Sequence, residues 1–173
     1  SMAEPKPARP VAIKSGGRTV AKHIDIEAGD GRSFKAYMAR PASGSGPGLV
    51  VLPDIFGINA TIRQMADHFA EEGYVVLVPD IFWRQEPGVE LGTSEAERPR
   101  AIALYQGFDL EAGLADIAAT IGTLRKRPEQ MGKVGILGHT FGGTLAYLAA
   151  ARTDVDCAVS YYGVGVDQHL GEA

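Results

Sequence analysis

The chain has 173 residues, of which 45% are hydrophobic and 22% charged, and its formal net charge is −4. This length and composition predict one globular domain with a sizeable core, and the acidic balance argues against nucleic acid or an anionic membrane surface as a partner. The single cysteine, Cys157, excludes an internal disulfide framework and favours a reducing, cytoplasmic setting, and no apolar stretch approaches the ~20 residues that span a bilayer.

The first predicted elements are an N-terminal arm and a hairpin. We interpret residues 1–16 as a tag scar followed by a flexible Pro-rich arm, so the folded domain is expected over 17–173. Alternating apolar and polar residues predict two half-buried strands over 19–28 and 33–41. The "GDGR" between them is typical of a hairpin turn.

Buried strands alternate with helices through the rest of the chain. Short continuous apolar runs predict strands that are covered on both faces, and helical periodicity predicts the segments between them. The long helical segment is expected to be interrupted near Pro99 and Gly107. The predicted strands are 48–57, 74–82, 133–138 and 157–163, and the predicted helices are 59–73, 94–128 and 142–152.

This order predicts an α/β fold with three layers, in which helices cover both faces of a mostly parallel sheet that begins with an N-terminal hairpin. Ligands of such sheets collect at the carboxyl ends of the strands. Four strand tips, "PDIFGIN", "PDIFWRQ", "GHTFGG" and "YYGVGV", are therefore expected along one edge, where they form a candidate site.

The tip "GHTFGG" has the spacing of a nucleophile elbow, with Thr140 at the point between Gly138 and Gly142. The central residue of such a strand-to-helix turn takes a strained conformation, usually with positive φ. The N–H of the next residue, Phe141, can donate to an oxyanion at the helix N-terminus. The alternative is a tight turn whose glycines serve packing alone.

Several co-linear motifs give the chain a resemblance to the dienelactone hydrolase family. The segments "LPDIFGIN", "PDIFWRQEPG", "LYQGFDLEAGLADI", "KVGILGHTFGG" and "SYYGVGV" follow the order and spacing of that family from about residue 47 to the C-terminus. The resemblance implies an α/β-hydrolase fold. It also implies hydrolysis of lactones or small esters through a Cys-His-Asp triad, with no cofactor and no metal.

The resemblance assigns catalytic roles to four positions. It places the nucleophile at Thr140, where the family has cysteine, and the oxyanion donors at the backbone N–H groups of Phe141 and Ile55. It places an acidic residue that contacts the nucleophile at Asp54, where the family usually has glutamate. The alternative role for Asp54 is to cap the turn after its strand.

The resemblance also implies two substrate-binding residues. An arginine that binds a substrate carboxylate falls on Arg98, in a charged run, with Arg84 and Arg100 as rival candidates. The aromatic residue downstream of it, usually a tryptophan, falls on Tyr105, which is either pocket wall or core.

Two other residues near the strand tips have open roles. His139 stands where the family usually has tyrosine and is a candidate base. Cys157 is expected to be a small core residue rather than a displaced nucleophile.

Two departures from the family bear on activity. Thr140 is β-branched, which disfavours positive φ, and its hydroxyl is far less ionised than a thiol and needs a strong base. The triad acid and histidine of the family follow on two further strands, so the resemblance implies that this chain corresponds to the N-terminal two-thirds of the fold, without its last strands and helices. Asp167 and His169 lie downstream, two residues apart in one loop. Such a loop is ill suited to place the carboxylate of Asp167 behind the imidazole of His169 as its orienting partner.

The sequence therefore predicts a hydrolase of lactones or small carboxylate-bearing esters whose own activity is impaired. The alternatives are a non-catalytic module that binds a small molecule on the same fold, and a subunit completed by a partner chain. The outer edge of the expected strand 157–163 has no predicted neighbour, so it is a template for self-association.

Overall fold

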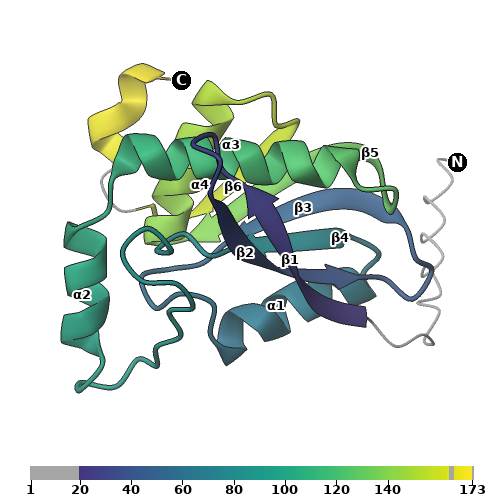
Figure 1. The fold of residues 1–173 in the computed structure, drawn as a ribbon. Helices are drawn as coiled ribbons and strands as arrows, with labels where there is room; N and C mark the ends of the chain where they lie inside the picture. The colour runs from purple at the N-terminus through teal and green to yellow at the C-terminus, as the bar shows by residue number, and fades with distance from the viewer. Residues whose placement is uncertain (1–19, 164–165, 173) are drawn as a thin grey trace, which may run out of the picture.

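A computed structural model describes residues 20–163 and 166–172 (Figure 1), so the predicted arm at 1–16 lies outside the described residues. The described part is built on a six-stranded sheet in the order β1-β2-β4-β3-β5-β6. The strands are β1 (Val20–Glu27), β2 (Ser33–Arg40), β3 (Gly46–Leu52), β4 (Val75–Pro79), β5 (Gln130–His139) and β6 (Cys157–Tyr161). The helices are α1 (Ala60–Glu71), α2 (Arg98–Gln106), α3 (Leu110–Lys126), α4 (Phe141–Arg152) and the 3₁₀ helix η1 (Val166–Glu172).

The sheet begins with the predicted hairpin and is otherwise mainly parallel. β1 pairs antiparallel with β2, and β2 pairs antiparallel with β4. The hairpin turn contains Gly31 at φ 86°, a conformation that glycine adopts without steric cost. The pairs β3–β4, β3–β5 and β5–β6 are parallel. This topology confirms the predicted α/β fold with an N-terminal hairpin.

The helices form a layer on each face of the sheet (Figure 1). α1 covers one face, where its residues Ile62, Ala66 and Ala70 belong to an apolar cluster with side chains of the strands. α3 and α4 cover the other face, where Ile117 and Leu145 belong to a second, larger cluster. Burial of these side chains removes apolar surface from water and holds the three layers together. The predicted three-layer arrangement is therefore confirmed.

The helical segment between β4 and β5 divides as the sequence indicates, with one difference. Gly107 separates α2 from α3, and the Asp109 side chain caps α3 by accepting a hydrogen bond of 3.1 Å from the N–H of Ala112. Pro99 does not interrupt a helix but lies in the first turn of α2, where a missing N–H leaves no hydrogen bond unmade. None of the helices in 20–163 and 166–172 is long and apolar enough to cross a bilayer.

β6 departs from its predicted burial. Val159 and Tyr161 are about half exposed, and Cys157 is exposed. Within the described residues β6 lies at the edge of the sheet and pairs with β5 alone. The prediction that Cys157 is a core residue is therefore wrong, because an apolar run specifies a strand but not the place of that strand in the sheet.

Asp80, directly after β4, is a buried carboxyl group that is 4% exposed. Its Oδ2 accepts a hydrogen bond of 2.8 Å from the N–H of Gly88, whereas its buried Oδ1 has no partner among the described residues. Burial disfavours the charged form and raises the pKa of Asp80 above its ordinary range, which outweighs the opposite effect of the backbone donors. The folded state therefore binds a proton at Asp80 more tightly than the unfolded chain does.

We expect Asp80→Asn to flatten the pH dependence of stability. In the wild type the free energy of unfolding should fall as the pH rises from about 4 towards the raised pKa, because the folded state holds the extra proton over that range. Urea unfolding between about pH 4 and about pH 8 would measure this slope.

Asp30→Asn is the matched control for this experiment. Hydrogen bonds from Arg32 hold the pKa of Asp30 well below its usual range, so above about pH 5 its carboxyl group is ionised in the folded and the unfolded state, and its replacement should leave the slope in that range unchanged. A wild-type slope that persists in Asp80→Asn would contradict the assignment.

Candidate active site

The carboxyl ends of β3, β5 and β6 lie side by side at one end of the sheet, as expected for parallel strands. Thr140 lies between β5 and α4, and Asp54 follows β3. The N–H of Thr140 donates a hydrogen bond of 2.8 Å to the carbonyl oxygen of Tyr161, the last residue of β6. The helix α2 stands at the same end of the molecule (Figure 1).

The turn at Thr140 is the nucleophile elbow that the glycine spacing predicts. Thr140 has φ 54° and ψ −115°, a region that L side chains rarely adopt. A Cβ atom on Gly138 would lie 2.2 Å from the carbonyl oxygen of Gly142, and one on Gly142 would lie 2.8 Å from the carbonyl oxygen of Leu52. Both positions therefore require glycine, because the backbones of the elbow and of the β3 tip are in contact.

A single carboxylate binds the Thr140 side chain and the neighbouring loop. Thr140 Oγ1 donates a hydrogen bond of 3.0 Å to Asp54 Oδ2. Asp54 Oδ1 accepts a second hydrogen bond, of 2.8 Å, from the N–H of Ile55. Asp54 is therefore directed at the elbow and also stabilises the turn after its strand, so the two roles weighed for it in the sequence are compatible.

Of the two expected oxyanion donors, the N–H of Ile55 already donates a hydrogen bond, and the N–H of Phe141 donates none to a described residue. Phe141 is the first residue of α4, so its N–H has no acceptor within the helix. The N–H of Ile55, by contrast, is occupied by Asp54 Oδ1. A carbonyl oxygen at the elbow would therefore find the Phe141 N–H available and would have to displace the Asp54 carboxylate to reach Ile55.

A hollow of about 360 Å³, which we call the Thr140 hollow, lies above the elbow. Apolar side chains make up most of its wall, and Thr140 and Asp54 supply oxygen atoms. Its lining residues are Asp54, Ile55, Phe56, Arg98, Ile102, Tyr105, Thr140 and Phe141. The hollow therefore brings together the sequence-predicted residues Asp54, Ile55, Arg98, Tyr105, Thr140 and Phe141, but not Arg84, Arg100 or His139.

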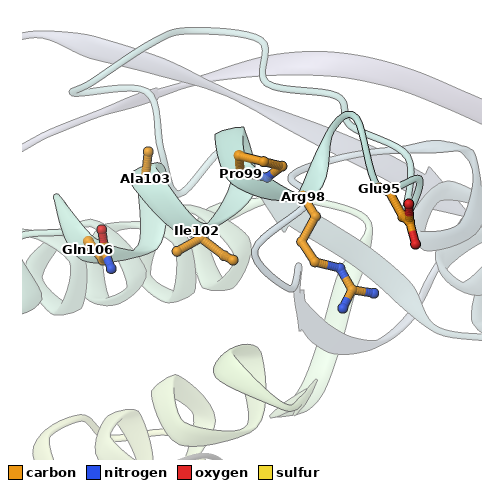
Figure 2. Close-up of a pocket in the computed structure, with 6 residues that line it drawn as sticks. All are labelled: Glu95, Arg98, Pro99, Ile102, Ala103 and Gln106. Carbon is orange, nitrogen blue, oxygen red and sulfur yellow. The ribbon is translucent and has the colours of Figure 1, made fainter.

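Helix α2 provides the wall opposite the elbow. Arg98, Ile102 and Tyr105 follow at intervals of four and three residues, which places them on one face of the helix. Figure 2 shows Arg98 and Ile102 on α2, where they also line a neighbouring hollow of about 490 Å³. Arg98 forms no ion pair or hydrogen bond with any described residue, so its guanidinium is free to bind an anion. Sequence reasoning missed Ile102, although its spacing from Arg98 on a helix was the available signal.

The two rival arginines lie elsewhere. Arg84 binds Asp116 through two hydrogen bonds of 2.9 Å and Asp30 through one of 3.1 Å, and it packs on the ring of Trp83. The hydrogen bonds to Asp116 are the largest cause of a raised pKa at Arg84. Arg100 forms an ion pair with Glu86. Of the three arginines, Arg98 alone lines the Thr140 hollow.

No histidine of the described residues hydrogen-bonds to Thr140 Oγ1. The ring of His139 stacks on Tyr161, with centroids 4.6 Å apart. The Nδ1 atom of His169 lies 3.4 Å from the carboxylate of Glu172, and so its partner is Glu172 and not Asp167. In the part of the chain that the structure describes, no group of acidic, histidine or cysteine side chains could hold a metal ion.

Comparisons with known proteins show which family the chain resembles. A sequence model of the dienelactone hydrolase family matches residues 34–173. The chain is 42% identical over 148 residues to a carboxymethylenebutenolidase from Pseudomonas putida, a match that covers 85% of this chain and 63% of that protein. It is 38% identical over 148 residues to carboxymethylenebutenolidase 1 from Cupriavidus pinatubonensis, with the same two coverages.

The fold is similar to that of solved structures as well. A candidate dienelactone hydrolase from Klebsiella pneumoniae superposes with a TM-score of 0.72 and 28% sequence identity, over 84% of this chain and 60% of that one. The chain thus spans less than two thirds of the length of these relatives.

We expect substitutions of Thr140 that relieve the backbone strain at its positive φ to stabilise the protein, and substitutions that keep the strain but remove the hydroxyl to destabilise it. A threonine held in this region of φ and ψ costs on the order of 1–3 kcal/mol, and its hydrogen bond to Asp54 contributes about 0.5–1.5 kcal/mol. Thr140→Gly and Thr140→Ser should therefore melt at or above the wild-type Tm. Thr140→Val keeps the strain and loses the hydroxyl, so it should melt below the wild type.

Differential scanning calorimetry of the four proteins would measure this order. A Thr140→Val variant that is as stable as Thr140→Gly would show that the turn is not strained.

Proposed function

This chain belongs to the dienelactone hydrolase family, and we propose that it carries the nucleophile elbow and the substrate-binding wall of a hydrolase that acts on lactones or small carboxylate-bearing esters. The observation that carries the proposal is the convergence of Thr140, Asp54, Phe141 and Arg98 on one hollow. The name of the relatives, carboxymethylenebutenolidase, supports a carboxylate-bearing butenolide as one substrate class.

Each of these residues has a separate part in acyl transfer. Thr140 Oγ1 is the attacking atom, which bonds to the carbonyl carbon before the bond to the leaving oxygen breaks. Asp54 Oδ2, at 3.0 Å, is the group within reach of the hydroxyl proton, which it accepts and passes to the leaving oxygen, and water then cleaves the ester formed with Thr140. The N–H of Phe141 stabilises the negative charge that develops on the carbonyl oxygen. Arg98, across the hollow, attracts the carboxylate of the substrate.

The second oxyanion donor requires a rearrangement of Asp54. Its Oδ1 holds the Ile55 N–H at 2.8 Å, so the resting site offers one free donor and one occupied donor. Asp54 Oδ2 has to stay at Thr140 until it has accepted the hydroxyl proton, and rotation of the Asp54 side chain then releases the Ile55 N–H. Completion of the oxyanion hole is therefore coupled to loss of the proton from Thr140.

We propose that hydrolysis by this 173-residue chain is slow. A threonine hydroxyl is protonated at neutral pH and needs a strong base, and its observed partner is a carboxylate and not an imidazole. The same fact favours the second candidate function, a module that binds a small acidic molecule without chemistry. A cytoplasmic setting is part of the proposal, because a reducing compartment would preserve the exposed free thiol of Cys157.

We expect Thr140→Cys in this chain to show no steady-state turnover of p-nitrophenyl acetate at neutral pH. The thiol would gain reactivity from a neighbouring imidazole, and none of the described histidines bonds to the elbow side chain. Release of p-nitrophenol would measure turnover, with Thr140→Val as the background. Wild-type protein that releases about one equivalent in a burst is a hydrolase arrested after acylation, and wild-type protein without a burst is a binding module.

Turnover by Thr140→Cys would contradict the prediction. Such turnover would assign the base to His139 or His169. Loss of the turnover when His139→Gln is added to Thr140→Cys would identify His139 as the base, and retained turnover would identify His169.

We propose that the chain self-associates through β6. The outer edge of β6 has no neighbour among the described residues, and its exposed Val159 and Tyr161 add apolar surface to unpaired backbone groups. Light scattering should therefore give a mass above that of the 18.3 kDa monomer, and Val159→Lys should lower it.

Val20→Lys is the matched control, because Val20 on the opposite edge strand β1 has the same exposed fraction of 44%. A monomeric mass at all concentrations, or an equal effect of both lysines, would exclude self-association through β6.

A further inference from the structure

We propose that a second hollow beside the Thr140 hollow is a subsite for an aryl-bearing arm of the substrate, and that the side chain of Tyr105 is the gate between the two. This inference rests on the proposed function and adds the substrate class. The second hollow measures about 500 Å³ and lies between α2, the start of α3 and η1. Nothing in the catalytic geometry described above uses it.

The two hollows share two walls, the rings of Phe141 and Tyr105. Phe141 is 7% exposed, and apart from Tyr105 it is held by the rings of Phe82 at 6.3 Å and Phe108 at 5.1 Å between centroids. Phe141 is also the residue whose N–H lies at the elbow. It is therefore a fixed partition next to the reacting position.

Tyr105 is the less constrained of the two walls. It is 42% exposed, its ring meets Phe141 edge-on at 5.0 Å, and its hydroxyl bonds to no described residue. Rotation of its side chain would break this one ring contact and no hydrogen bond. Because Tyr105 lines both hollows and Phe141 is fixed, we expect that rotation to open one into the other.

Helix α2, which carries Tyr105, is also lightly attached. Only Ala101 and Leu104 of α2 are buried, and the side chain of Glu97 at its N-terminus makes no capping hydrogen bond. Its polar attachments are the hydrogen bond of 2.8 Å from Gln85 Nε2 to the Leu104 carbonyl oxygen and the ion pair of Arg100. Small displacements of the gate therefore do not require the sheet or the elbow to move.

The chemistry of the second hollow differs from that of the first. Its lining includes the aromatic and aliphatic side chains of Phe108 and Leu110 together with Gln106 and residues of η1. The charged residues of η1 include Asp167 and the His169–Glu172 pair, so the second hollow does not favour an anion. Arg98, which has no partner among the described residues, lines the Thr140 hollow but not the second hollow.

An ester has two arms that diverge from its carbonyl group. With the carbonyl at Thr140, the arm that carries the carboxylate lies towards Arg98, and an uncharged aryl arm passes Phe141 into the second hollow. The substrate class is therefore an ester with one anionic arm and one aryl-bearing arm, longer than the Thr140 hollow alone accommodates.

Titration calorimetry with carboxylates of increasing length tests this inference on the 173-residue protein. The series is acetate, benzoate, 4-phenylbutyrate and 6-phenylhexanoate. Tyr105→Ala should tighten the binding of the longest member by a factor of about ten, because the phenyl ring then enters the second hollow without displacing a side chain, and it should leave acetate unchanged.

Three further variants serve as controls. Ile102→Ala enlarges the Thr140 hollow but not the second hollow, so it should not favour the longest member. Tyr105→Phe should match the wild type, because the hydroxyl is not used. Arg98→Ala should weaken all four carboxylates by about tenfold or more, the loss expected for a charged hydrogen bond. Amide NMR shifts of Gln106 and Phe108 on addition of 6-phenylhexanoate to the wild type would place the ring.

The outcomes separate the two proposals. The subsite alone would be overturned if the affinity for the carboxylates depended on Arg98 but did not change with arm length, either in the wild type or in Tyr105→Ala. No binding of any carboxylate, or binding that Arg98→Ala does not weaken, would overturn the proposed carboxylate site and the subsite with it.

Discussion

The close contact between the backbone of the elbow and the tips of two neighbouring strands is the constraint on which the site depends. Side chains at Gly138 or Gly142 would collide with carbonyl groups at 2.2–2.8 Å, so the turn has one available path. That path fixes Thr140 at a positive φ and directs its hydroxyl to Asp54. It also begins α4 at Phe141, which then supplies both an unpaired N–H and the ring that divides the two hollows.

Two charged side chains, Asp54 and Arg98, would act in opposite directions on the anionic substrate that we propose. The Asp54 carboxylate lies beside Thr140 and repels both a substrate carboxylate and the oxyanion of an acyl transfer. Arg98 attracts the same carboxylate from the other side of the hollow. In the proposed reaction, an acidic ester is therefore oriented with its charge away from the elbow and its carbonyl towards it, and movement of Asp54 away from the Ile55 N–H removes the repulsion where the oxyanion forms.

The sequence predicts those features that depend on local backbone chemistry. Glycine spacing around Thr140 predicts the elbow, and a continuous apolar run predicts the buried part of β5, residues 134–138, because this part is covered on both faces. Features set by distant contacts are beyond such reasoning. The partner of Arg84 is Asp116, 32 residues away, and no local pattern distinguishes that structural arginine from the free Arg98. The edge position of β6, which exposes Cys157, likewise depends on what lies beside it in space.

The division between the elbow and α2 separates chemistry from selectivity. The elbow is held by backbone contacts that leave no room for a side chain at Gly138 or Gly142, so substitutions at these two positions alter the fold of the turn itself. α2 contributes Arg98, Ile102 and Tyr105 from a helix with only two buried residues, so substitutions on its exposed face alter the hollow without disturbing the sheet. A site built in this way keeps its reacting atoms fixed while the size and charge of the accepted substrate can vary. Thr140 lies on the constrained side of that division, where its strain is maintained by the surrounding backbone and not by its own side chain.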